Sequence, residues 1–251
     1  MLAPLLTLTV ETALLLGCMA ALNWRSLKRQ PRLTGLIFLA FYLDNLLITA
    51  ASLYPRLRLI PNHAWDGLLT ADWSGKLYSM LAFAVLIWFC RGLLSPDEIG
   101  LTLRQKSDAW LPAALITAAL GLGFFLSGLP FPRASFDPQM LAYLALMPGL
   151  NEELVYRGVM LAAANRLFAP RWRLYGARLG WGAVLITLIF APLHGFWLDP
   201  ALRLHLLPGR VLISLFTGAI FAWLRERTGR LFFPFLAHGA VDFFAYLGRM
   251  A

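Results

Sequence analysis

Three charged residues lie close together in an otherwise apolar segment: Glu152, Glu153 and Arg157. An ionised side chain at the centre of a bilayer costs roughly 3 kcal/mol on insertion scales, so such a group usually marks a functional site. Two later apolar segments add His194 and His238. A carboxylate can activate a water molecule, and imidazoles can position it or pass its protons on. These residue types therefore indicate hydrolysis inside a membrane.

Helical spacing gives the two glutamates different surroundings. Residues four apart share one helix face, whereas neighbours diverge by about 100°. Glu153 and Arg157 are thus predicted to form an ion pair, with the acidic residue first, which is the favourable order. Glu152 faces another direction and stays free to act on a water molecule as a general base.

The two histidines occur in similar local patterns. Phe190 lies four residues before His194, so its ring is predicted to brace the imidazole, and Pro192 is expected to kink or end that helix. Asp242 lies four residues after His238. Either Asp242 accepts a hydrogen bond from the ring of His238 and selects its tautomer, or one of the two side chains faces the substrate.

The same residues leave the question of a metal open. Glu152, His194 and His238 are also the ligand types of a His₂Glu zinc site. The sequence has no HExxH motif, the pattern that usually supplies two such histidines from one helix. The prediction is therefore that no cofactor is required, with zinc as the alternative.

Composition places these residues in a membrane protein. Of the 251 residues, 59% are hydrophobic and 14% are charged, whereas soluble proteins have about 25% charged residues. The net charge of +9 comes from basic residues that lie between apolar segments. Basic residues in such places set topology and contact anionic lipids. The predicted partner is therefore the lipid bilayer, and nucleic acid is not expected.

The elements that must position the motifs are long apolar segments. A helix of about 20 apolar residues spans a bilayer core. The segments that meet this pattern are 3–23, 33–54, 77–94, 109–128, 139–167, 177–197, 209–225 and 231–249. We therefore expect an all-α, polytopic transmembrane bundle of about eight helices. Residues 1–251 are predicted to form a single integral-membrane domain, with its motif-bearing core at about 139–249.

Basic residues predict the orientation of this bundle. The loop after the first segment contains Arg25, Lys28, Arg29 and Arg32, and such clusters remain in the cytoplasm. Both termini are then outside, on the side to which Lys76 is assigned as a residue of the loop 55–76.

Depth is less simple for the motif residues. If all helices were straight, Glu152 would lie near the middle of the membrane, with His194 near the outer end. His238 would then lie nearer the cytoplasm.

Taken together, the motifs resemble those of a known family. Glu152-Glu153-xxx-Arg157, Phe190-xxx-His194 and His238-xxx-Asp242 are similar to the EExxxR, FxxxH and HxxxN motifs of the CPBP family. That family contains CAAX prenyl proteases and membrane proteins related to bacteriocin processing and abortive infection. Asp242 stands where eukaryotic members carry asparagine. The motifs span residues 152–242, and the expected helix count fits the whole chain.

This resemblance implies an intramembrane endopeptidase of the glutamic type. By analogy, Glu152 and His194 would activate water, while His238 and residue 242 would serve the oxyanion. An ionised Asp242 has no proton to donate, so it would have to be protonated or orient His238. The implied partner is a membrane-anchored protein or peptide, cleaved near its C-terminus, in a bacterial inner membrane.

Two other functions use the same residues. An ion or proton-coupled transporter also places ionisable side chains inside the membrane. A non-catalytic immunity protein that binds a peptide would need the cavity but not the chemistry. The sequence shows no convincing internal repeat, which disfavours a transporter built from two related halves.

Overall fold

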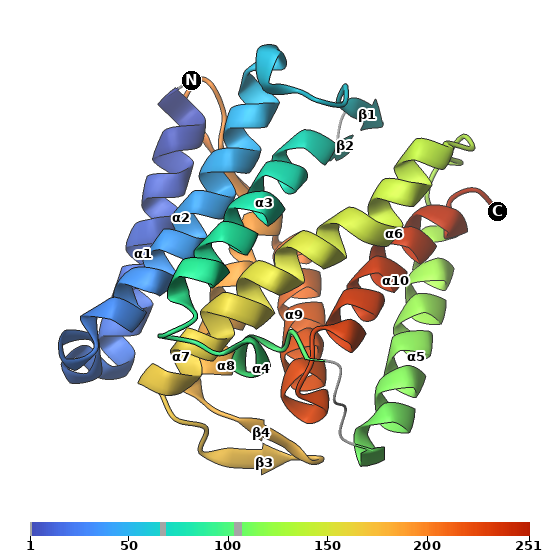
Figure 1. Cartoon of the computed structure of the whole chain (residues 1–251). Helices are drawn as coiled ribbons and strands as arrows, with labels where there is room; N and C mark the ends of the chain where they lie inside the picture. Colours follow the sequence, from blue (N-terminus) through green and yellow to red (C-terminus); the bar gives the residue numbers. More distant parts are fainter. Residues whose placement is uncertain (1, 66–68, 103–106) are drawn as a thin grey trace.

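The computed structural model describes residues 2–65, 69–102 and 107–251. Long helices run side by side between the two ends of a bundle, and both chain termini lie toward the same end (Figure 1). The α-helices in this part of the chain are α1 (Leu2–Arg29), α2 (Pro31–Leu53), α3 (Trp73–Cys90), α4 (Pro96–Ile99), α5 (Trp110–Gly128), α6 (Pro138–Glu152), α7 (Leu161–Leu167), α8 (Trp181–Phe190), α9 (Pro208–Thr228) and α10 (Phe232–Gly248).

Short elements join these helices. Three antiparallel hairpins are formed by β1 (His63–Trp65) with β2 (Leu69–Ala71), β3 (Trp172–Leu174) with β4 (Ala177–Leu179), and β5 (Phe196–Leu198) with β6 (Leu204–Leu206). Single helical turns of the tighter 3₁₀ type are η1 (Pro55–Leu57), η2 (Ser107–Ala109) and η4 (Pro192–His194). A wider π-helical segment, η3 (Glu153–Met160), connects α6 to α7.

The predicted all-α polytopic fold is confirmed, since each of the expected apolar segments contains a helix. Among the described residues, α1, α2, α3 and α5 are long and apolar enough to cross a membrane. The helices that bear the motifs do not meet this criterion. The α6 and α8 helices have 15 and 10 residues, respectively, because η3 and η4 interrupt the regular pattern at the motifs.

The π-helical segment η3 lies at the centre of the bundle. Val155, Tyr156, Val159 and Met160 are buried there, and η3 contacts α2, α3, α6, α7, α8, α9 and α10. Single wide turns of this kind inside α-helices occur frequently at functional sites. The segment 139–167, predicted as one helix, therefore consists of α6 and α7 joined by the π-helical segment η3.

Glycine brings α6 and α10 into direct backbone contact. A Cβ atom on Gly239 of α10 would overlap the backbone oxygen of Ala145 on α6. A Cβ atom on Gly149 of α6 would lie 2.8 Å from the backbone oxygen of Phe235 on α10. Small residues at such crossings let helices approach closely in a membrane. The helices that carry Glu152, His238 and Asp242 are held together in this way.

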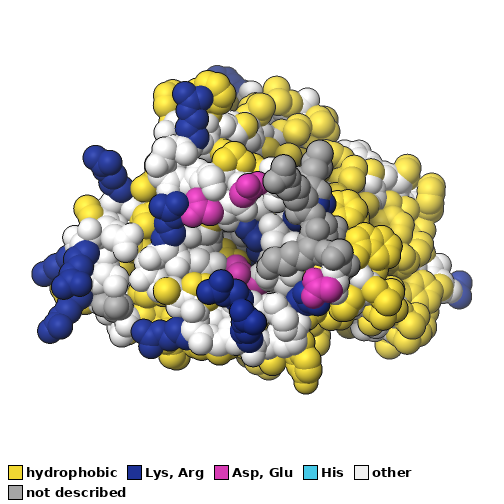
Figure 2. All heavy atoms as spheres, turned by 60° about the horizontal axis from the view of Figure 1, so that its bottom comes forward, with side chains coloured by type: hydrophobic (Ala, Val, Ile, Leu, Met, Phe, Trp, Pro, Cys, Tyr) yellow, Lys and Arg dark blue, Asp and Glu magenta, His cyan; other side chains and the backbone are white. Residues whose placement is uncertain are grey.

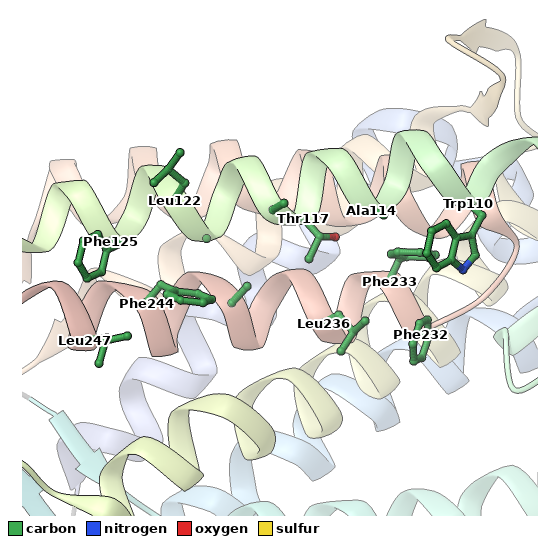
Figure 3. Close-up of a pocket in the computed structure, with 13 residues that line it drawn as sticks. Trp110, Ala114, Thr117, Leu122, Phe125, Phe232, Phe233, Leu236, Phe244 and Leu247 are labelled. Atoms are coloured by element: carbon green, nitrogen blue, oxygen red, sulfur yellow. The ribbon is translucent and has the colours of Figure 1, made fainter.

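The outer face of the bundle is strongly apolar. A groove of about 730 Å³ lies between α5 and α10. Figure 3 shows the rings of Trp110 and Phe233 at one end of it and those of Phe125 and Phe244 toward the other. The indole of Trp110 is 55% exposed and Leu122 is 61% exposed. Such exposure is expected where lipid acyl chains, rather than water, cover a helix pair.

Charge gathers at one end of the bundle. Figure 2 brings forward the end opposite the chain termini and shows many Lys and Arg side chains there, with hydrophobic side chains covering large areas beside them. Lys28 and Arg29 end α1 at this end, and the β3–β4 hairpin adds Arg173 and Arg178. This clustering follows the charge asymmetry on which the predicted orientation rests.

The α6–α10 contact can be tested with Gly239→Ala. The added methyl group would collide with the backbone of α6, and overpacking of this kind typically costs about 1–3 kcal/mol. We expect a lower melting temperature for the purified protein in detergent. Gly35→Ala is the matched control, because nothing lies within 4 Å of a Cβ at that position. Equal melting temperatures for the two variants would contradict the close contact.

Candidate active site

The side chains of the three motifs line one cavity of about 360 Å³: Glu152, His194, His238 and Asp242. Glu152 ends α6, His194 ends η4, and the other two lie one turn apart on α10. The helices are not straight through the motifs. As expected from Pro192, α8 ends at Phe190 and His194 follows in a separate short turn, so the motifs meet at one cavity.

The two carboxylate oxygens of Glu152 have different neighbours. Its Oε1 atom lies 2.7 Å from the Nζ atom of Lys76. Its Oε2 atom lies 3.6 Å from Nε2 of His194 and 3.8 Å from Nε2 of His238. This second oxygen is buried and has no hydrogen-bond partner among the described residues. Glu152 therefore presents one unpaired oxygen to both imidazoles.

His194 is oriented by its own helix end. Its Nδ1 atom lies 3.0 Å from the backbone oxygen of Phe190, and the two rings are 4.5 Å apart. A carbonyl oxygen can only accept a hydrogen bond, so Nδ1 carries the proton. In the neutral ring, Nε2 is then the basic nitrogen, and it faces Glu152. The predicted contact between Phe190 and His194 is present.

His238 is oriented by Glu153. Its Nδ1 atom lies 2.8 Å from Oε1 of Glu153, while its Nε2 atom lies 3.6 Å from Oδ2 of Asp242 and 3.8 Å from Oε2 of Glu152. Of the two roles left open for Asp242, selection of the tautomer is thus taken by Glu153. Nε2 of His238 lies between two carboxylates, and Asp242 lies beside the reactive nitrogen.

Arg157 completes this support. Its NH1 atom donates to Oε1 of Glu153 at 3.0 Å, the oxygen that also contacts His238, and the predicted ion pair is therefore present. NH2 donates to the backbone oxygen of Gly218 at 3.2 Å. The guanidinium carbon lies 4.0 Å from the ring centroid of Phe190, a cation–π contact. Arg157 therefore links η3, α8 and α9 behind the imidazoles.

A second polar network lies next to Glu152. Asn151 donates to Oδ1 of Asp44 at 3.1 Å and to Oγ of Ser79 at 2.8 Å. Ser79 in turn donates to the same oxygen of Asp44 at 2.5 Å. All three side chains are buried, so these bonds join α2, α3 and α6 inside the bundle, next to Glu152 in the chain.

Lys76 belongs to the site although the sequence pattern does not predict it there. The pattern predicts that Lys76 lies in the loop 55–76, but α3 begins at Trp73 and Lys76 is buried. Asp72 caps the helix, since its side chain accepts a hydrogen bond from the backbone N–H of Gly75. An aspartate before an apolar run is a helix start signal. Read in this way, Asp72 would have placed Lys76 inside the helix.

The zinc alternative has a partial structural basis. The three ligand types of a His₂Glu site are neighbours, since Oε2 of Glu152 lies 3.6 Å from Nε2 of His194 and 3.8 Å from Nε2 of His238. Within the described ranges, no group of three acidic, histidine or cysteine side chains has the arrangement that a metal ion requires. The geometry suits a bound water at least as well, because a water can bridge atoms about 3.6–3.8 Å apart.

Residues 134–244 match the model of a protein family described as type II CAAX prenyl endopeptidase, Rce1-like. The match includes all three motifs and confirms the family resemblance expected from them. The match supports the prediction of a membrane-embedded endopeptidase whose substrate is a membrane-associated protein. No curated protein and no solved structure matches the chain.

The buried ion pair of Glu153 can be tested with Arg157→Met. Removal of one partner of a buried pair leaves an uncompensated charge and typically costs about 3–5 kcal/mol. We expect a loss of this size in the free energy of unfolding, measured by titration with sodium dodecyl sulfate in mixed micelles.

Arg166→Met is the control for this measurement. Arg166 pairs with Glu98 at 2.7 Å, but the two side chains are 47% and 36% exposed. Exposed pairs typically contribute at most about 1 kcal/mol. If both variants lost the same stability, Arg157 would not be the internal support of the site.

Proposed function

We propose that this chain is an intramembrane endopeptidase of a bacterial inner membrane, which hydrolyses a peptide bond near the C-terminus of a membrane-associated protein. Residues 1–251 would act as one integral-membrane domain, with the chemistry in its motif-bearing part at about 139–249. The observation that carries the proposal is the unpaired Oε2 of Glu152, which faces two imidazole Nε2 atoms in a cavity among apolar helices.

In the proposed reaction, a water molecule binds between Oε2 of Glu152 and Nε2 of His194. Glu152 accepts one proton of the water as the water oxygen forms a bond to the carbonyl carbon of the substrate. The carbonyl oxygen becomes an oxyanion. Glu152 then gives the proton to the departing nitrogen as the C–N bond breaks. The products are a carboxylic acid and an amine, and Glu152 returns to its ionised form.

His238 is the proposed donor to the oxyanion. A carboxylate faces each ring nitrogen, Glu153 at Nδ1 and Asp242 at Nε2. The ring can therefore hold a proton at both nitrogens, and the proton at Nε2 can be donated to a developing negative charge. Asp242 itself, when ionised, can only accept, so we assign it the orientation of Nε2.

The wall of the cavity continues beyond the motif residues. Its wall combines the polar side chains of the site with Tyr143, Tyr246, Thr70 and Arg249. Thr70 belongs to β2 and Arg249 follows α10, so the cavity extends toward the end of the bundle at which the chain terminates. Arg249 donates to the backbone oxygen of Pro132, and the same wall contains the carboxylates of Glu152 and Asp242. What supports cleavage near a substrate C-terminus is therefore the likeness to CAAX prenyl endopeptidases rather than the charge of this wall.

The proposal is tested by comparison of membrane-protein C-termini, identified by mass spectrometry, in cells that express wild type, Glu152→Ala or Glu152→Gln at matched levels. Loss of a general base typically reduces the rate by about 10²–10⁴-fold. We therefore expect new C-termini with wild type alone. A chelator arm, with and without added zinc, tests metal dependence in isolated membranes.

Identical C-termini in all three cell lines would contradict the protease proposal. Ion flux in proteoliposomes that is lost with Glu152→Gln would then indicate a transporter. Full biological activity of a Glu152→Ala/His238→Ala double variant would instead indicate a non-catalytic peptide-binding protein.

A further inference from the structure

Lys76 is a cation in direct contact with the proposed general base, and it lies outside the sequence motifs and the family match. Its Nζ atom is 2.7 Å from Oε1 of Glu152, and the side chains are 8% and 16% exposed, respectively. The two residues come from α3 and α6, far apart in the chain. A lysine is expensive to bury in a membrane, so a buried lysine calls for a functional explanation.

Charge balance gives one part of that explanation. Three carboxylates surround the imidazoles, those of Glu152, Glu153 and Asp242. Arg157 is the counter-ion of Glu153 at 3.0 Å. Lys76 is the corresponding counter-ion of Glu152. Without it, Glu152 would be a carboxylate in low-dielectric surroundings with only the two imidazoles nearby, at 3.6 and 3.8 Å. A protein avoids a poorly compensated buried charge by taking up a proton.

The second part is geometric. The ammonium contacts Oε1, so the plane of the carboxylate is held with Oε2 toward His194 and His238. A carboxylate without this contact could rotate and offer either oxygen to either neighbour. A displacement of about 1 Å in a reacting group can reduce the rate by roughly 100-fold. The contact with Lys76 thus selects which oxygen acts on the water.

The position of Lys76 is itself supported. Ser79 lies one turn further along α3 and is bonded to Asn151, the residue before Glu152. Asp44 of α2 accepts hydrogen bonds from both. These bonds hold α3 against α6 beside the ion pair. They therefore keep the Lys76 side chain within contact distance of Glu152.

We propose that Lys76 is a positioning residue of the active site, which keeps Glu152 ionised and directs its Oε2 atom to the water between the imidazoles. The proposal rests on the protease function proposed above. It assigns to α3 a role in the chemistry that otherwise belongs to η4, α6 and α10.

The first test compares Lys76→Met, Lys76→Arg and Lys28→Met on the substrate that the C-terminal comparison identifies. We expect Lys76→Met to lower kcat about 100-fold, with KM changed less than threefold. Lys76→Arg retains the positive charge and should restore at least a tenth of the wild-type kcat. Lys28→Met is the matched control on an exposed helix end and should behave as wild type.

The second test needs no substrate. Dicyclohexylcarbodiimide reacts with protonated carboxyl groups in apolar surroundings, and the labelled residue is located by mass spectrometry. We expect Glu152 to stay unlabelled in wild type and in Lys76→Arg, and to be labelled in Lys76→Met. A Lys76→Met/Glu152→Gln double variant controls for labelling at neighbouring carboxyl groups. Melting temperatures show that each variant is folded.

The results separate the two proposals. If wild type cleaves no protein but the labelling follows the expected pattern, the protease function fails while the control of Glu152 by Lys76 stands. If folded Lys76→Met cleaves at the wild-type rate or faster, Lys76 is not a positioning residue. A folded Lys76→Met protein whose Glu152 remains unlabelled would also overturn the proposal.

Discussion

Two adjacent carboxylates lie among apolar helices, and each needs a cation within contact distance. Glu153 finds Arg157 on its own helix at 3.0 Å, and Glu152 finds Lys76 on α3 at 2.7 Å. In low-dielectric surroundings, removal of either cation would leave a buried charge whose desolvation only the neighbouring imidazoles could offset. The packing of α3 against α6 and the path of η3 through the centre of the bundle both depend on satisfying these two charges.

The two ion pairs also divide the work between neighbouring residues. Oε1 of Glu153 contacts both Arg157 and His238. Glu153 therefore orients an imidazole and takes no direct part in the proposed reaction. Glu152 uses Oε1 for Lys76 and keeps Oε2 for the cavity. Each carboxylate has its own counter-ion, so both can stay ionised although they are neighbours in the chain. Two carboxylates that shared one site would repel each other, and one of them would take up a proton.

The backbone prepares the same arrangement. The π-helical segment follows Glu152 directly, α8 ends at Phe190, and Gly239 lets α10 touch α6. Each of these departures from a regular, well-separated helix brings a motif residue to the cavity. The apolar groove between α5 and α10 (Figure 3) is lined by other residues of α10 than the polar cavity is, so the same helix faces lipid with one side and the polar site with the other.

Composition and segment length are enough to predict the membrane-embedded helical class, because both are averages that tertiary contacts hardly alter. The sequence also predicts the ion pair of Glu153 with Arg157 and the contact of Phe190 with His194, since both pairs are four residues apart and a helical or tightly turned backbone keeps such residues close. The contact of Lys76 with Glu152 and that of Glu153 with His238 depend instead on how the helices pack. The partners in these contacts are separated by 76 and 85 positions in the chain, respectively. Their distances are set by helix packing, which leaves no local pattern in the sequence.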